Sequence, residues 1–417
     1  MAASESGTQR SLMKTDIHAK YKNTPEGDEA EKIIRSCVHC GFCNATCPTY
    51  QELGDERDGP RGRIYLIKQM LETDEASEST RLHLDRCLTC RSCETTCPSG
   101  VEYGKLLDIG RGVVEKKVPR TWRERLLRKI LLLLLPYPQR FGFLIVVGQW
   151  VRPALPEYLR KKIPEKQVPI TWPPQRQPRV MMGLHGCAQS ITTPNTNAAA
   201  ARVLDRLGVS LIASTDAGCC GAVSYHLGAQ DEGKRLMKKN IDAWWPAIES
   251  GLEAIVITAS GCGELVKEYG HILKDDPEYA EKAHRVSQMT RDLSEVVAAE
   301  DLSVLSIKRN YSKIAVHCPC TLQHGQKLPG IVEKILTDVG FDLASARDKH
   351  LCCGSAGAYS LLQPKMSRQL LKKKVAALVQ DDPDTIVTAN VGCQLHLASE
   401  ARVPVRHWIE IMDEALG

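Results

Sequence analysis

The chain has 417 residues, of which 43% are hydrophobic and 25% charged, and its formal net charge is only +5. This composition excludes a disordered chain, a collagen-like chain and a polytopic membrane protein. The small net charge gives no reason to expect nucleic acid as a partner. The length predicts two or three domains, and the 17 cysteines are too dilute for a small disulfide scaffold but are clustered along the chain.

The first segment, residues 1–30, is expected to form a polar N-terminal arm. It contains no apolar core of the kind that a secretory signal needs. We therefore expect a cytoplasmic protein, in which clustered cysteines stay reduced and bind metal more often than they form disulfides.

Residues 31–120 hold eight cysteines and are expected to form an all-helical domain. Ile64, Ile67 and Leu71 recur at helical spacing, and a second helix is predicted across Leu106 and Val114. We find no alternating strand pattern in this segment, so the fold of the domain is predicted to be helical throughout.

Two copies of the motif C-x2-C-x2-C-x3-C-P dominate this domain. Three thiolates at these spacings reach three corners of one 4Fe–4S cubane, and the fourth thiolate, before the proline, binds the other cubane. Two zinc sites are a poorer explanation, because four-ligand zinc sites leave the third cysteine and the proline without a role. The predicted ligands are Cys37, Cys40, Cys43 and Cys97 for cluster 1, and Cys87, Cys90, Cys93 and Cys47 for cluster 2.

The connector, residues 121–178, is basic, leucine-rich and proline-rich. Residues 111–180 carry 16 Lys or Arg against 4 Asp or Glu, and neither of the two apolar runs in this region reaches the roughly 20 residues of a spanning helix. Three interpretations stay open: a buried helix followed by a linker, a docking surface for an acidic protein, and peripheral contact of residues 121–160 with anionic lipid.

The remaining residues alternate between predicted strands and helices, which indicates parallel α/β sheets. The predicted strands are 179–184, 209–212, 254–258, 313–317 and 385–389. Thr193, Pro194 and Gly208 mark the start and the end of one helix between the first two strands.

An internal duplication divides this part into a first CCG repeat, residues 179–305, and a second CCG repeat, residues 306–417. A single cysteine precedes a Cys-Cys-Gly triplet by the same 32 residues in both, and the two copies lie 133 residues apart. We expect two α/β domains related by a pseudo-two-fold axis, holding one or two further 4Fe–4S clusters, with a purely structural role for one copy as the alternative. The candidate ligands are Cys187, Cys219, Cys220 and Cys262 in the first repeat, and Cys318, Cys320, Cys352, Cys353 and Cys393 in the second.

Motifs for other cofactors are missing from the sequence. No G-x-G-x-x-G follows a predicted strand, and no P-loop or H-E-x-x-H is present. We therefore expect no flavin and no nicotinamide in this chain, no catalytic residue of its own for substrate oxidation, and a partner that supplies that chemistry.

Longer strings carry a family resemblance. DGPRGRIYLIKQ, HLDRCLTCRSCETTCPSG, HCPCTLQHGQKL, HLCCGSAGAYS and NIDAWWPAIE are similar to those of the iron–sulfur subunits of bacterial glycolate oxidase, also called glycolate dehydrogenase. The helical domain also resembles the ferredoxin domains of succinate dehydrogenase and heterodisulfide reductase, and the CCG repeats resemble those of heterodisulfide reductase. That family pattern ends in C-x-x-C, where this chain has Leu265 and His396.

This resemblance implies an α+β multidomain electron-transfer subunit that is inactive alone. Flavin-binding partner subunits would oxidise glycolate to glyoxylate, and this subunit would pass the electrons to a membrane quinone or a similar acceptor. The implied location is the cytoplasmic face of the inner membrane. The alternatives are a relay in a lactate or glycerol-3-phosphate dehydrogenase, and a disulfide reductase of the CCG type.

Overall fold

The computed structural model describes residues 13–156, 160, 163–214, 216–308 and 313–417. The first part of the predicted arm and residues 157–159 of the predicted membrane-contact segment lie outside the described residues. The chain divides into two compact units, unit 1 (Met1–Pro119) and unit 2 (Arg120–Gly417), which are described separately.

Unit 1 is helical, and the described residues of this unit contain no strand, as predicted. Its helices wrap a core that includes Ile34, Ile67 and Leu106 and reaches back to Ile17 in the predicted arm. The elements are α1 (Pro25–Ser36), η1 (Phe42–Thr46), α2 (Pro48–Leu53), η2 (Glu56–Asp58), α3 (Pro60–Thr73), α4 (Glu78–Asp85), α5 (Ser92–Thr96) and α6 (Tyr103–Lys117). Helix α6 packs against α1, α3 and α4. Its Gly110 permits this, because a Cβ there would lie 2.8 Å from Ile67.

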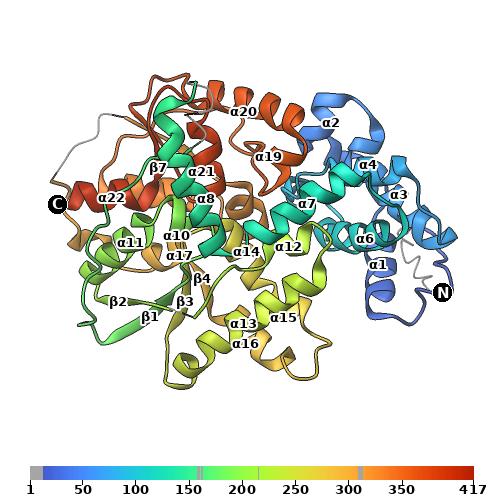
Figure 1. Cartoon of the computed structure of the whole chain (residues 1–417), viewed down its shortest axis with the longest axis horizontal. Coiled ribbons are helices and arrows are strands. Elements are labelled where there is room, and N and C mark those ends of the chain that lie inside the picture. The colour runs from blue at the N-terminus through green and yellow to red at the C-terminus, as the bar shows by residue number, and fades with distance from the viewer. Residues whose placement is uncertain (1–12, 157–159, 161–162, 215, 309–312) are drawn as a thin grey trace, which may run out of the picture. The chain divides into compact units, whose positions relative to one another are not determined.

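The first CCG repeat is built on a parallel four-stranded sheet in the order β2-β1-β3-β4 (Figure 1). Its strands are β1 (Arg179–Gly183), β2 (Val209–Ala213), β3 (Ala254–Ile257) and β4 (Thr290–Asp292). Its helices are α10 (Gln189–Thr192), α11 (Asn195–Arg206), α12 (Ala222–His226), α13 (Gln230–Glu249), α14 (Ser260–Lys267), α15 (Tyr269–Ile272), α16 (Ala280–Met289) and α17 (Leu293–Ala298).

The second CCG repeat has the same topology with one strand reduced. Its parallel sheet has the order β5-β6-β7, and an isolated bridge between Ile314 and Leu343 stands where β2 pairs with β1 in the first repeat. Its elements are β5 (Ile314–His317), η5 (Thr321–Gly325), α18 (Ile331–Val339), α19 (Tyr359–Leu362), α20 (Pro364–Leu378), β6 (Thr385–Thr388), α21 (Val391–Ala398), β7 (Val405–His407) and α22 (Trp408–Leu416), and η4 (Leu302–Val304) precedes them.

Each repeat packs its last helix against the other repeat. Helix α22 of the second repeat packs on α11 of the first, and α17, the counterpart of α22, packs on α18, the counterpart of α11. One hydrophobic core runs through both repeats, and ion pairs such as Arg202–Asp413 reinforce the contact. This reciprocity is what a pseudo-two-fold axis produces, so the predicted duplicated α/β architecture is confirmed.

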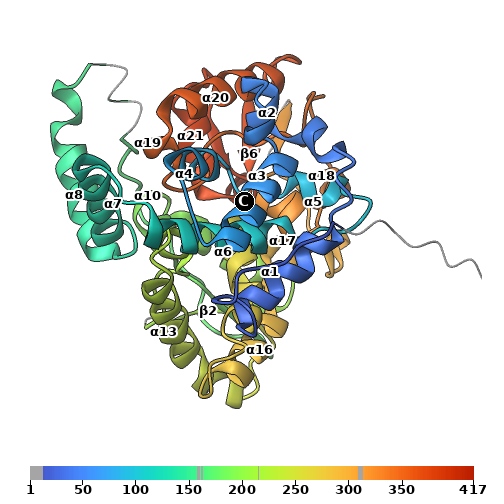
Figure 2. The same ribbon diagram turned by 90° about the vertical axis from the view of Figure 1, so that its right-hand side faces the viewer.

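The connector forms a helical hairpin on unit 2, made of α7 (Trp122–Leu134) and α8 (Pro138–Val151), with η3 (Arg152–Ala154) behind it. Figure 2 shows α7 and α8 side by side, and contacts between the two helices agree with that view. Tyr137 donates a hydrogen bond to Glu232 at 2.6 Å and Gly142 lies against Ile191, which attaches the hairpin to the first repeat.

The interpretation of the hairpin as a buried helix is wrong. Leu131 is the one buried residue of α7, and α8 has none. Among the described residues, no single helix is long and apolar enough to cross a membrane; only α7 together with Pro138–Ala154 meets that criterion, and this pair is bent by 103°.

Candidate metal centres

One cavity in unit 1 is walled by thiols. Its wall contains the four cysteines predicted for cluster 1 together with Cys93 and Tyr103. The predicted four are Cys37, Cys40, Cys43 and Cys97. Cys97 comes from the second motif, so the structure brings the fourth cysteine of one motif to the first three of the other.

A second cavity is walled by the cysteines predicted for cluster 2. These are Cys47, Cys87, Cys90 and Cys93. The two cavities share Pro60, Cys93 and Tyr103 in their walls, so they are direct neighbours. Two adjacent cavities with a thiol donor set of this kind fit two 4Fe–4S clusters.

Matching backbone turns aim these thiols inward. His39 and Gly41 in the first motif, and Thr89 and Arg91 at the same places in the second, all have left-handed φ angles between 54° and 85°. Two left-handed residues in each five-residue stretch curl the loop, so that its three cysteines face one side. The hydroxyl groups of Thr46 and Thr96, 3.1 Å apart, join the two motifs where their fourth cysteines cross.

Two side chains act on the sulfur atoms of the second cavity. Arg63 is fully buried, and its Nη1 lies 4.0 Å from Cys47 Sγ. Tyr103 donates a hydrogen bond to Cys87 Sγ over 3.6 Å. Donors and positive charge beside thiolates stabilise the electron-rich form of a cluster, so both side chains are placed to raise a reduction potential.

Arg63 is held by a buried polar network. Its Nε donates to the carbonyl of His83 at 2.7 Å, and its Nη2 pairs with Asp58, which also binds the His83 ring at 2.9 Å. Arg86 reaches the other oxygen of Asp58 at 2.9 Å. Although burial opposes the charge, the nearby thiolates, Cys87 first, raise the pKa of Arg63, so its guanidinium stays charged.

Burial favours the protonated form of one thiol in each wall, Cys43 in the first cavity and Cys93 in the shared wall. It raises the pKa of Cys43 to about 11 and that of Cys93 well above its ordinary range. Iron binding must therefore displace protons from these sulfurs, which makes loading dependent on pH.

In each CCG repeat, four of the candidate thiols form a chain of contacts. In the second repeat, Cys320 Sγ lies 3.8 Å from Cys352 Sγ, and Cys353 Sγ lies 3.4 Å from Cys393 Sγ. In the first repeat, Cys219 interacts with Cys187 and Cys220, and Cys220 with Cys262. The hydrogen bonds from its two neighbours lower the pKa of Cys220, and the one from Cys187 contributes most to raising that of Cys219.

The glycine of each triplet makes this clustering possible. Gly221 and Gly354 have φ angles of 94° and 87°, and their N–H groups donate to Cys219 Sγ and Cys352 Sγ, each at 3.4 Å. The two repeats therefore share one local geometry around their paired cysteines.

Cys318 and His396 lie apart from this thiol chain. Cys318 is packed in the hydrophobic core between the repeats, and burial raises its pKa to about 12. The Nε2 atom of His396 lies 3.1 Å from the hydroxyl of Ser367. The candidate role of Cys318 in metal binding stays a prediction.

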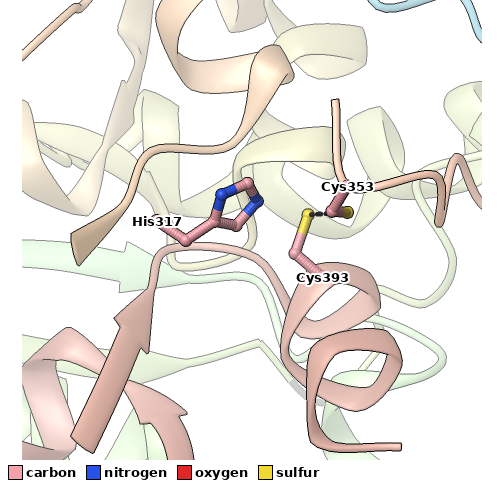
Figure 3. Close-up of side chains that lie close together, drawn as sticks. All are labelled: His317, Cys353 and Cys393. Atoms are coloured by element: carbon pink, nitrogen blue, oxygen red, sulfur yellow. Dashed lines mark hydrogen bonds between the residues drawn. The ribbon is translucent and has the colours of Figure 1, made fainter. Parts of the chain in front are cut away.

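Sequence reasoning noted His317 near these cysteines but favoured a core or supporting role for it, and the structure places it beside the thiols of the second repeat (Figure 3). Sequence reasoning missed Arg63 and Tyr103, because nothing in the local sequence of a helix says which of its residues meets a distant cysteine. The one available signal for His317 was the repeat itself, since the equivalent residue of the first copy is Leu184.

Family models match both parts of the chain. The model described as a 4Fe-4S dicluster domain matches residues 33–101, and that described as a cysteine-rich domain matches residues 183–267 and 314–398. The dicluster domain implies two 4Fe–4S clusters, which confirms the predicted cofactors of unit 1.

Full-length relatives define the family. The "Glycolate oxidase iron-sulfur subunit" of Escherichia coli is 57% identical over 97% of this chain and 99% of its own length. The "Probable glycolate oxidase iron-sulfur subunit" of Bacillus subtilis is 32% identical over 94% of this chain and 95% of its own length. "Lactate utilization protein A" of Bacillus velezensis is 29% identical over 54% of this chain and 96% of its own length. The near-complete coverage, the paired thiol-walled cavities and the duplicated cysteine-rich domains together place this chain in the family of glycolate oxidase iron–sulfur subunits.

Proposed function

We propose that this chain is the electron-transfer subunit of a flavin-dependent glycolate dehydrogenase complex. It receives electrons from a partner flavoprotein that oxidises glycolate to glyoxylate, and passes them to a membrane quinone or a similar acceptor. The observation that carries the proposal is the pair of adjacent thiol-walled cavities, which share the wall formed by Pro60, Cys93 and Tyr103.

The proposed ligand sets are crossed, with Cys97 completing the first set and Cys47 the second. When bound, 4Fe–4S clusters carry one electron at a time. They would therefore connect the two-electron oxidation of a hydroxy acid at a flavin to an acceptor that takes up electrons singly. The chain's own contribution is to exclude water and tune potential. Arg63 and Tyr103 stabilise added negative charge at Cys47 and Cys87.

The test uses the complex of this chain with its flavin-binding partner subunits. Cys40→Ser is expected to remove one of two 4Fe–4S EPR signals and to abolish glycolate-dependent dye reduction. Leu53→Ala, which shortens an exposed side chain of unit 1, is the control and is expected to keep both EPR signals and the dye reduction. Full activity in a Cys40→Ser complex that lacks one cluster, or glycolate turnover by the single chain, would refute the relay.

Lactate is the second candidate substrate, favoured by the partial match to lactate utilization protein A. That match spans about half of this chain, whereas the glycolate oxidase subunits match nearly all of it. The same complex assayed with lactate in place of glycolate distinguishes the two, and a higher kcat/KM for lactate would reverse the assignment.

We also propose that the α7–α8 hairpin attaches the subunit to the cytoplasmic face of an anionic membrane. Large apolar side chains of the hairpin face solvent, and Phe143 and Trp150 are 69% and 87% exposed. Cationic side chains flank them. The basic residues of the two helices and of η3 are Arg123, Arg125, Arg128, Lys129, Arg140 and Arg152. An apolar face with cationic flanks matches the boundary between acyl chains and anionic headgroups.

Flotation with phosphatidylglycerol vesicles tests this attachment. Burying an aromatic side chain contributes about 1.5 to 3 kcal/mol, so Phe143→Ser combined with Trp150→Ser is expected to lower the partition coefficient at least tenfold. Leu361→Ser removes an exposed apolar side chain elsewhere in unit 2 and is expected to change nothing. Equal flotation of all three proteins would rule out the hairpin as the attachment site.

A further inference from the structure

The two CCG repeats differ at one buried position next to their thiols. The 133-residue offset that pairs Cys187 with Cys320 also pairs Leu184 with His317. Both side chains are buried, and Leu184 belongs to the hydrophobic core of its repeat. Burying an imidazole without a hydrogen-bond partner is unfavourable, so leucine would be the more stable choice at both places. Packing alone therefore does not explain the presence of a histidine at this position.

His317 offers two ring nitrogens that bond to nothing in the protein. The residue is 2% exposed, and neither Nδ1 nor Nε2 has a hydrogen-bond partner. Its ring points at the sulfur atoms of Cys353 and Cys393 (Figure 3). One ring nitrogen and the two sulfurs all lie within 4.8 Å of one another.

The chemistry of the three groups suits a metal ion, because imidazole nitrogen and cysteine sulfur are both metal-ligating atoms. Neutral imidazole and thiolate are the ligands that zinc prefers in closed structural sites.

The spacing fits one ion. Zinc lies about 2.3 Å from thiolate sulfur and about 2.0 Å from imidazole nitrogen, so tetrahedral ligand atoms stand roughly 3.3 to 3.8 Å apart. Cys353 Sγ and Cys393 Sγ are 3.4 Å apart. In a cubane, by contrast, each protein thiolate binds a separate iron. The sulfur of Cys352 interacts with that of Cys353, which places it next to the fourth position of the zinc tetrahedron.

A buried cation balances the charge of such a site. Lys374 is 3% exposed, and its ammonium group donates to the carbonyl oxygens of Asp348 and Lys349 at 2.8 and 3.2 Å. Burial lowers the pKa of Lys374, and the nearby thiolates, Cys353 and Cys352 foremost, oppose that effect. One zinc ion with three thiolates and one imidazole carries a net charge of −1, which a single ammonium neutralises.

We propose that the second CCG repeat holds a single tetrahedral zinc ion bound by His317, Cys353 and Cys393, with Cys352 as the fourth ligand. Binding forms three Zn–S bonds and one Zn–N bond and releases the thiol protons to solvent, with no change of oxidation state. The first repeat, with Leu184 in place of the imidazole, lacks this ligand set. The site joins β5, the CCG loop and α21, so it clamps the second repeat from inside.

The test measures zinc and iron per chain in the full-length protein purified without oxygen, with zinc-edge X-ray absorption on the same sample. We expect about one zinc beside the eight irons of two 4Fe–4S clusters, and a first shell that contains both sulfur and nitrogen. His317→Leu, which installs the residue of the first repeat, is expected to lower zinc at least tenfold while iron is unchanged. His317→Cys is expected to restore it.

Val316→Ala is the matched control, since this buried residue precedes His317 directly but packs into the core between the repeats. It is expected to keep its zinc. The proposal would be overturned if the unmodified chain contained no zinc, or if the His317→Leu variant retained all of its zinc. So would about twelve irons without zinc, because an all-thiolate iron–sulfur cluster would then occupy the second repeat.

Discussion

The charge of Arg63 is expected to set the potential of one cluster of the dicluster domain. Its guanidinium is fully buried and approaches Cys47 Sγ to 4.0 Å. At an effective dielectric constant of 20, a unit charge at this distance interacts by about 4 kcal/mol, and by about half of that for an electron spread over atoms beyond the sulfur. Because about 1.4 kcal/mol corresponds to 59 mV for one electron, Arg63→Met is expected to lower one midpoint potential by roughly 90 to 170 mV.

An EPR-monitored redox titration of the purified chain measures this shift. Cys47 lines only one of the two thiol-walled cavities that are described, so one midpoint should move and the other should stay nearly constant. Arg86→Met is the matched control: it removes an ion pair with the same Asp58, but its side chain is 30% exposed and solvent screens its charge. Arg63→Lys, which keeps the charge, should shift less than Arg63→Met.

The reasoning is refuted if Arg63→Met, with both EPR signals present, leaves both midpoints unchanged or raises one of them. A shift by Arg86→Met as large as that by Arg63→Met would show that the whole Asp58 network, rather than contact with the thiolate, controls the potential.

Two further predictions concern the stability of unit 2. The pKa of buried His407, whose Nε2 donates to the carbonyl of Thr258 at 2.9 Å, is lowered to about 4, so the unfolded chain takes up a proton that the folded chain excludes. Stability should therefore fall as pH drops from 6.5 towards 4, by up to about 3 kcal/mol, and urea midpoints should show a flatter profile for His407→Gln. Gly354→Ala should lower the free energy of unfolding by at least about 2 kcal/mol, because its φ is 87° and the new Cβ would lie 2.7 Å from the Ser367 carbonyl oxygen. Gly357→Ala, at a φ of 59° with open space around it, should cost about 1 kcal/mol and serves as its control in the same urea series.

An unchanged pH profile in the His407 variant would mean that other groups govern acid unfolding. Equal losses for the two alanine variants would mean that the left-handed backbone, and not the approach to α20, explains the glycine of the Cys-Cys-Gly triplet.

The sequence by itself determined the features that depend on short-range spacing or on repetition. The twin cysteine motifs predict two neighbouring cavities with an exchanged fourth ligand, because three thiols within seven residues can face only one side of a loop. The buried runs 254–258 and 385–389 predicted strands β3 and β6, and the duplication predicted two sheets of one topology. Strands β4 and β7 escaped prediction, because each has three residues with an exposed or half-buried arginine in the middle.

Tertiary structure alone decided which residues meet across the chain. Arg63 lies on a helix whose periodicity says that it faces inward, but only packing brings it to Cys47. Likewise, His317 is the last residue of the buried strand β5 and Cys318 follows it. Successive residues there point in opposite directions, so the side chain of His317 joins the thiols and that of Cys318 joins the core. Sequence spacing constrains neighbours along the chain, whereas contacts between distant elements depend on how their faces pack, and that is where the chemistry of the second repeat is decided.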